Sequence, residues 1–301
     1  MWLSLAFVSA ALLGLYDIAK KTSLRGNAVL PVLLLNTVFS TLIFLPFIVL
    51  SRCGGRGMVG DLFYVPAAGW EVHRLIILKA MLTLSSWICG YFALKHLPLT
   101  IAGPINATRP VMVLVGAMLV FGERLNALQW VGTAFAVVSF FLLGMSGKKE
   151  GIDFRHNRWI ALLVLAAVLG AASGLYDKYL MRDIAPMTVQ SWFNVYQMAA
   201  MAVIVAVLWW PRRRQGEPFR WRWSIVLISV FLSAADFAYY YALSSDGAMV
   251  SVVSMVRRAS VVVSFMGGVL IFREKNIRGK LIDLALVLAG MVFLYLGSRG
   301  G

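Results

Sequence analysis

The segment Gly-Leu-Tyr-Asp at residues 14–17 occurs again at residues 174–177, each time inside a long apolar stretch. Each copy opens a half of the chain in which five apolar stretches follow one another, and stretches of roughly 20 residues predict membrane-spanning helices. Because five is an odd number, the second half crosses the membrane in the opposite direction to the first. Inverted repeats of this kind are common in secondary transporters, whose substrate site lies between the repeats near the middle of the bilayer.

The composition also indicates a membrane protein. Of the 301 residues, 60% are hydrophobic and 14% are charged, whereas a soluble domain is about half apolar and about a quarter charged. We predict an all-α membrane protein with ten transmembrane helices, at residues 1–24, 28–51, 71–94, 97–121, 125–146, 157–181, 186–210, 221–244, 247–272 and 276–297. They form a first five-helix repeat at 1–146, a linker at 147–156 and a second five-helix repeat at 157–301. The longest connection, residues 51–70, is predicted to be a surface loop.

The formal net charge of +15 would suggest a nucleic-acid partner in a soluble protein. Here most Lys and Arg residues lie between the predicted helices, so we expect no nucleic-acid binding. Basic residues concentrate in the cytoplasmic loops of membrane proteins, and this rule, applied literally, puts both termini outside the cytoplasm. An even number of spans requires only that the two termini lie on the same side.

No motif in the sequence predicts an enzyme, a metal site or a cofactor. The cysteines, Cys53 and Cys89, and the histidines, His73, His96 and His156, lack the spacing of metal ligands. No phosphate-binding loop, serine-hydrolase motif or zinc-protease motif occurs. The first helix lacks the basic flank and the cleavage site of a signal peptide, so we expect it to remain as a span.

Charged side chains are costly inside a membrane, so those within the predicted helices are the first functional candidates. Asp236 lies before the tip of the hairpin between the eighth and ninth helices, and Arg257 and Arg258 lie a similar distance after it. At a rise of about 1.5 Å per residue, all three lie near the middle of the membrane. We expect Asp236 to pair with one arginine, because neighbouring helical residues point about 100° apart and one carboxylate does not satisfy both.

Arg109 lies at a similar depth in the fourth predicted helix, opposite a part of the third helix that has no carboxylate. Two interpretations remain open. Arg109 pairs with Asp17 or Asp177 from another helix, or it is available to an anionic or carbonyl-bearing ligand, for which its planar guanidinium is suited. The arginines outnumber Asp236 near the midplane, which favours an anionic group on the substrate.

Asp17 and Asp177 occupy equivalent positions in the two repeated segments. The spacing of Asp17 to Lys20 and Lys21 is that of ion pairs within a helix, and this structural role stands beside a functional one. For Asp177 the sequence indicates no partner. Because carboxylates inside a membrane often relay protons or hold cations, Asp17, Asp177 and Asp236, together with Lys21, are candidates for coupling or charge balance.

Polar and aromatic side chains on the same helices complete the candidate substrate site. They are Asn106, Thr108, Tyr16, Tyr176, Trp87, Tyr239 and Tyr240. Each has a structural alternative, because polar side chains also bond helix to helix and aromatic side chains also pack or face lipid. For Asn36 and Asn194, bonding between helices is the favoured interpretation.

Four further motifs occur in the first half: Ala-Leu-Lys-His-Leu-Pro-Leu at 93–99, Arg-Pro at 109–110, Phe-Gly-Glu-Arg-Leu-Asn at 121–126 and Gln-Trp-Val-Gly at 129–132. Together they resemble the EamA-type module of the drug/metabolite transporter superfamily. The second half is similar more loosely. It has Phe-Arg-Glu at 272–274, no proline equivalent to Pro110, and Asp283 where the first half has Gly132.

The resemblance implies a ten-helix bundle around a central cavity, lined chiefly by the first, third, fourth, sixth, eighth and ninth helices. Members of the superfamily move amino acids, drugs, nucleotide sugars, sugar phosphates and lipid-linked sugars. They are commonly drawn with cytoplasmic termini, in conflict with the loop charges of this chain.

We therefore expect a secondary transporter in a bacterial cytoplasmic membrane that moves a small metabolite with an anionic or zwitterionic group by alternating access. Arg109, Arg257 and Arg258 would bind the negative group. The expected partners are the substrate, the lipid bilayer and, as a candidate coupling ion, protons. Two alternatives stay open: a flippase for a lipid-linked sugar or lipid phosphate, and a membrane scaffold without transport.

Overall fold

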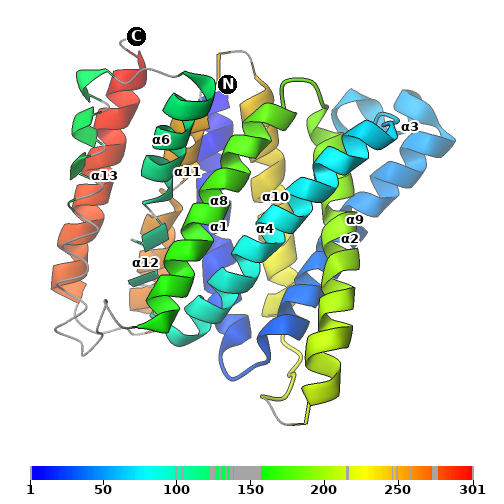
Figure 1. Cartoon of the computed structure of the whole chain (residues 1–301), viewed down its shortest axis with the longest axis horizontal. Coiled ribbons are helices and arrows are strands. Elements are labelled where there is room, and N and C mark those ends of the chain that lie inside the picture. Colours follow the sequence, from blue (N-terminus) through cyan, green and yellow to red (C-terminus); the bar gives the residue numbers. More distant parts are fainter. Residues whose placement is uncertain are drawn as a thin grey trace.

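The structure, a computed structural model, describes residues 2–98, 101–102, 105–106, 108–122, 126–128, 130–132, 134–135, 138, 157–214, 217–245, 247–248, 250–257, 259–272 and 277–299. Its helices are α1 (Trp2–Leu24), α2 (Val29–Cys53), α3 (Gly55–Phe63), α4 (Trp70–His96), α6 (Arg109–Phe121), α8 (Arg158–Leu180), α9 (Pro186–Ile204), η1 (Val205–Trp209), η2 (Trp210–Arg212), α10 (Ser224–Ser244), α11 (Val250–Arg257), α12 (Ser260–Leu270) and α13 (Ile277–Arg299). Every regular element in these ranges is helical, which confirms the all-α prediction (Figure 1).

Six helical stretches are long and apolar enough to span a membrane: α1, α2, α4, α8, Pro186–Arg212 and α10. Their bounds agree with the predicted helices to within a few residues. The predicted fourth helix contains the shorter α6, the ninth contains α11 and α12, and the tenth corresponds to α13. The predicted fifth helix, 125–146, falls largely outside the described residues. The chain is a multi-pass membrane protein.

The prediction of a loop at 51–70 was wrong in part, because α3 lies within this connection. The glycines of the segment favoured a loop, since glycine is a poor helix former. The structure forms a short helix here nonetheless, interrupted at Gly60, whose φ of 74° is accessible to glycine at little cost. None of the residues of α3 is fully buried, but Phe63 at its end stacks on Phe47 and Phe237 at the edge of a core cluster.

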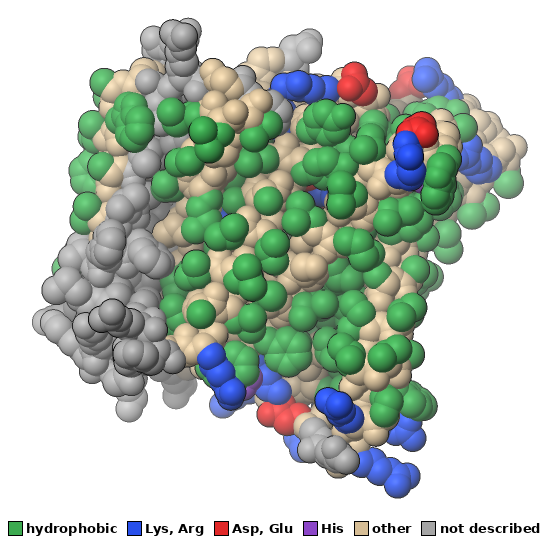
Figure 2. All heavy atoms as spheres, viewed as in Figure 1, with side chains coloured by type: hydrophobic (Ala, Val, Ile, Leu, Met, Phe, Trp, Pro, Cys, Tyr) green, Lys and Arg blue, Asp and Glu red, His purple; other side chains and the backbone are tan. Residues whose placement is uncertain are grey.

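The outer surface has the polarity expected of a protein in a bilayer. In Figure 2 apolar side chains cover the middle of the visible face, and charged side chains lie at its upper and lower edges. α1 begins and α13 ends at the same edge (Figure 1). Both chain ends therefore lie on one side of the apolar band, as an even number of spans requires.

The first helix of each half packs among helices of the other half. α1 contacts α10, α11 and α12, and α8 contacts α4 and α6. Small residues permit this close approach: a Cβ added at Gly14 of α1 would overlap Val263 of α12. A Cβ added at the equivalent Gly174 of α8 would make only ordinary contacts, at 3.7 Å to Tyr239 Oη and 3.9 Å to Val113 Cγ2.

The predicted ninth helix is interrupted rather than continuous, because α11 ends at Arg257 and α12 begins at Ser260. Around the break the backbone forms bonds between residues three apart, from Ala259 N to Val256 O (3.0 Å) and from Val262 N to Ala259 O (3.0 Å). The first half repeats the pattern at its fourth helix, where Thr108 N donates to Ile105 O (3.2 Å) and Val111 N to Thr108 O (3.1 Å). Such tightened turns often occur at functional positions in helices.

Candidate functional site

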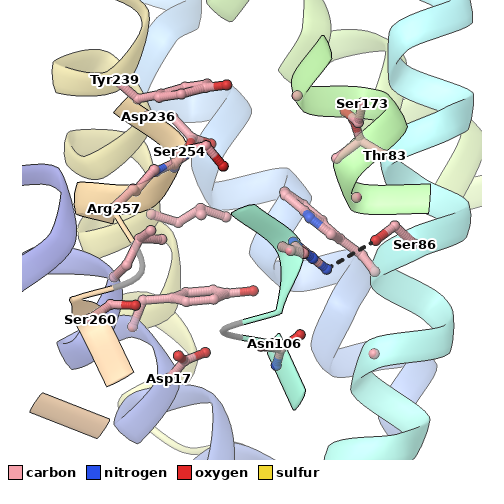
Figure 3. A pocket seen from close by; sticks show the side chains of 18 of the residues that line it. Asp17, Thr83, Ser86, Asn106, Ser173, Asp236, Tyr239, Ser254, Arg257 and Ser260 are labelled. Atoms are coloured by element: carbon pink, nitrogen blue, oxygen red, sulfur yellow. Dashed lines mark hydrogen bonds and ion pairs between the residues drawn. The ribbon is translucent and has the colours of Figure 1, made fainter. Parts of the chain in front are cut away.

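A cavity of about 160 Å³ lies between the two halves of the chain. Its walls come from α1, α4, α6, α8, α10, α11 and α12, and α9 contributes Phe193. Apart from α9, these elements belong to the predicted first, third, fourth, sixth, eighth and ninth helices, the set that the resemblance implied. Asp236 and Arg257 lie on one side of the cavity and Ser86 and Ser173 on the other (Figure 3).

The expected pair between the eighth and ninth helices forms with Arg257. Its guanidinium bonds the Asp236 carboxylate through Nη2 and donates from Nε to Ser9 Oγ at 3.0 Å. The guanidinium also lies 4.1 Å from the ring centre of Tyr239, a cation–π contact. Nε and Nη2 of Arg257 are thus bonded to the protein itself. Arg258 lies outside the described residues.

Asp177 has a partner that the sequence reasoning missed. Lys79 of α4 bonds the Asp177 carboxylate of α8, and the two residues are only 1% and 5% exposed. The Lys79 ammonium also lies 4.6 Å from the ring centre of Phe193 and 5.2 Å from that of Tyr240. A lysine inside the predicted span 71–94 is itself the signal that could have drawn attention to this position, since charges within a span are rare.

Asp17 is paired within its own helix. Lys20 Nζ lies 3.0 Å from Asp17 Oδ1, and Ser264 Oγ of α12 donates to Asp17 Oδ2 at 3.1 Å. Lys20 also lies 4.3 Å from the ring centre of Tyr16. The other candidate for the intrahelical pair, Lys21, donates instead to the carbonyl oxygens of Leu94 (2.9 Å) and Leu97 (2.7 Å), where it joins α1 to the end of α4.

Arg109 has no carboxylate within ion-pair distance among the described residues. Its Nη2 donates to Ala166 O at 3.1 Å and approaches Ser86 Oγ at 3.4 Å, the contact dashed in Figure 3. Its Nε is buried and has no hydrogen-bond partner in the described part of the chain. Of the two interpretations open from the sequence, pairing with Asp17 or Asp177 does not occur, because lysines hold both carboxylates.

The described lining of the cavity carries one more positive than negative charge. The cations are Lys20, Lys79, Arg109 and Arg257, and the carboxylates are Asp17, Asp177 and Asp236. Each carboxylate has one of the cations at ion-pair distance. The remaining positive charge belongs to Arg109, which lies within reach of a ligand in the cavity.

The other predicted site residues divide into two groups. Asn106, Trp87, Tyr16, Tyr239 and Tyr240 line the cavity. Thr108 and Tyr176 are not among its lining residues: Thr108 Oγ1 donates to Ile105 O at 2.7 Å, and Tyr176 Oη donates to Leu75 O at 3.3 Å. Within the described ranges, no cluster of His, Cys, Asp and Glu could hold a metal ion.

The two asparagines expected to join helices differ in their contacts. Asn36 of α2 accepts a bond from Ser229 Oγ of α10 at 3.1 Å and donates to Tyr91 Oη of α4 at 3.5 Å. Asn194 donates to Gln190 O of its own helix at 3.0 Å. Because Tyr91 lines the cavity, the bond from Asn36 connects α2 to the cavity wall.

Comparison with known proteins identifies the family. The model of the EamA-like transporter family matches residues 1–145 and again residues 157–296. A riboflavin transporter of Rhizobium johnstonii is 31% identical over 124 residues, which are 41% of this chain and 38% of that protein. A probable 4-amino-4-deoxy-L-arabinose-phosphoundecaprenol flippase subunit ArnE of Aeromonas hydrophila is 29% identical over 111 residues, which are 34% of this chain and 96% of that protein.

A solved crystal structure supports the same fold over nearly the full length. It superposes with a TM-score of 0.66 at 20% sequence identity and covers 98% of both chains. At this identity the likeness concerns the fold alone. The family match, in contrast, rests on the sequence of both halves and agrees with the motifs at 93–99, 109–110, 121–126 and 129–132. The chain belongs to the EamA-like transporter family.

Proposed function

We propose that this protein is a secondary transporter that carries a small metabolite with an anionic or zwitterionic group across a bacterial cytoplasmic membrane. Ten transmembrane helices would form two inverted five-helix repeats, residues 1–146 and 157–301, joined by a linker at 147–156. The match of one family model to each half and the cavity between the halves support this arrangement. Rocking one repeat against the other would expose the cavity to each side of the membrane in turn.

The proposal of an anionic substrate rests on Arg109. Arg109 lines the cavity, and the three carboxylates described there are each paired with another cation. A carboxylate or phosphate on a ligand would supply the counter-charge that the Arg109 guanidinium lacks. The planar guanidinium suits both groups, because it can form two parallel bonds to them. Asp17, Asp177 and Asp236 would then balance the other cations, couple transport to protons, or hold an amine of a zwitterion.

The first test uses thermal unfolding of the purified protein with ligand pairs that differ in one negative group. Suitable pairs are riboflavin with flavin mononucleotide, glucose with glucose 6-phosphate, and amino acids with their methyl esters. A ligand that binds the folded state raises the unfolding temperature by mass action. We expect the member with the negative group in at least one pair to raise this temperature, and its neutral or esterified counterpart to have little effect.

Two variants test whether the stabilisation by the anionic ligand depends on Arg109. Arg109→Ala should abolish the stabilisation by the anionic ligand, whereas Arg213→Ala should preserve it, because Arg213 is an exposed arginine between α9 and α10. Stabilisation by neutral or cationic compounds alone would contradict the anion site and move the substrate contact to the aspartates. A ligand identified in this way is then tested for uptake into proteoliposomes, where a scaffold without transport would show no flux.

The flippase alternative is supported by the relative named ArnE, whose name specifies an amino sugar carried on a phosphoundecaprenol lipid. The two functions share a phosphate or carboxylate at Arg109 and differ in the lipid chain. A short-chain polyprenyl phosphate in the same unfolding assay separates them. Stabilisation by this lipid and by none of the soluble anions would favour the flippase.

A further inference from the structure

Gly170 of α8 forms the surface on which the Arg109 guanidinium rests. A Cβ added at position 170 would overlap Cζ, Nη1 and Nη2 of Arg109. Ala166, one turn earlier on α8, accepts the bond from Arg109 Nη2 at 3.1 Å. The guanidinium of a helix in the first half is therefore held in a notch on a helix of the second half.

The backbone at Gly170 does not itself require glycine. The residue lies in the interior of α8, where glycine is less favourable than alanine. The described glycines with positive φ are Gly26, Gly55, Gly60, Gly122 and Gly247, so position 170 has a conformation that alanine adopts readily. The space taken by the Arg109 side chain is what distinguishes this position from an ordinary helical one.

We propose that Gly170 is a positioning residue for the anion site. Because it has no side chain, the Arg109 guanidinium can lie against α8 at the boundary between the repeats, facing the cavity. This inference rests on the proposed function of Arg109. An alanine at position 170 would displace the guanidinium from Ala166 and Ser86. Anion binding would be weakened although every charge of the cavity remains.

A double-mutant cycle tests the notch. The variants are Gly170→Ala, Arg109→Lys and the two combined, with Gly174→Ala as the matched control one turn further along α8. A lysine keeps the positive charge but lacks the planar group that fills the notch. We expect Gly170→Ala to lower the unfolding temperature when residue 109 is arginine and to leave it unchanged or raised when residue 109 is lysine. Gly174→Ala should have the same effect in both backgrounds.

The second readout is the affinity for the anionic ligand found in the unfolding assay, or for inorganic phosphate if that binds. Gly170→Ala should weaken binding by about tenfold or more with Arg109, and change it little with a lysine there. Equal effects of Gly170→Ala on stability and binding in both backgrounds would overturn the proposal. If Gly170→Ala folds only in the lysine background, the notch is supported; if it folds in neither, glycine is required for another reason and the proposal fails.

The two proposals fail separately. If no anionic ligand binds the wild-type protein but the stability cycle shows coupling between positions 109 and 170, the notch stands and the anion site is wrong. If anions bind through Arg109 and the cycle shows no coupling, the anion site stands and Gly170 does not position it.

Discussion

Three of the cations that line the cavity share one kind of environment, and Arg109 does not. Lys20, Lys79 and Arg257 each have an aspartate at ion-pair distance and an aromatic ring within 4.1–4.6 Å. Such surroundings replace the water that a buried cation loses. Among the described residues, the acceptors of Arg109 are a backbone carbonyl and a hydroxyl only. This difference between residues of the same charge supports assigning the ligand to Arg109.

The buried pair of Lys79 and Asp177 leads to a prediction about stability. Neutralising one member leaves an uncompensated buried charge, which costs about 3–5 kcal/mol, whereas replacing both often costs little. We expect Lys79→Met and Asp177→Asn each to lower the unfolding temperature strongly, and the double variant to recover most of the loss. Thermal unfolding of the three variants measures this. Additive losses in the double variant would show that the two side chains do not depend on each other.

At the scale of the elements, the close packing of α1 on α12 depends on Gly14. A Cβ at this position would overlap Val263 and lie 3.0 Å from Ser260 O, and neither atom belongs to a flexible chain end. At the equivalent Gly174 of α8, an added Cβ would overlap no neighbouring atom. The same glycine in the two repeated segments therefore meets different neighbours.

We predict opposite effects for the two equivalent substitutions. Gly14→Ala should destabilise the protein by about 1–3 kcal/mol, the usual cost of overpacking. Gly174→Ala should be neutral or stabilising by up to about 1 kcal/mol, because alanine is the better helix former. The unfolding temperatures of both variants in the same detergent decide between these outcomes. A loss of equal size at both positions would mean that the two helix contacts are equally tight.

At the scale of the whole molecule, the two edges of the apolar band differ in charge. The edge at the end of α9 and the start of α10 carries exposed arginines, namely Arg25, Arg158, Arg212, Arg213, Arg214 and Arg220. Exposed tryptophans lie at the same edge, namely Trp210, Trp221 and Trp223, as expected where side chains meet the lipid head groups. The opposite edge, which holds both chain ends (Figure 1), carries Arg52, Arg56, Arg74 and Arg182 together with Asp61, Glu71 and Asp183.

The positive-inside rule then predicts that the arginine-rich edge faces the cytoplasm and that both termini face outward. Cys53, exposed at the opposite edge, offers a direct test. It should react with a membrane-impermeant maleimide in intact spheroplasts. In a Cys53→Ser background, Arg213→Cys should react only after permeabilisation. The reverse pattern would place the termini in the cytoplasm, as is commonly drawn for the superfamily.

Much of the helical architecture was predictable from the sequence, because the length of an apolar stretch suffices to define a membrane helix. The bounds of α1, α4 and α8 followed from hydrophobicity alone. The break between α11 and α12 did not, since the stretch 247–272 has no proline, and its adjacent arginines, Arg257 and Arg258, indicate a costly charge in the membrane but not a helix break. The short α3 was also missed, because its glycines favour a loop and because the packing of its Phe63 on Phe47 and Phe237 depends on the tertiary fold.

The sequence by itself determined the long apolar helices, the repeated segments and the charged positions that the membrane makes costly, since these depend only on local composition and spacing. The tertiary structure alone decided which charges meet. Lys79 and Asp177 are 98 positions apart in the chain, and their pairing depends on how α4 and α8 are rotated against each other. For the same reason only the packed helices reveal the partner of Asp177, whereas the spacing of Asp17 and Lys20 along one helix already indicated their pair. That leaves Arg109, resting against Gly170, as the described cavity cation without a carboxylate.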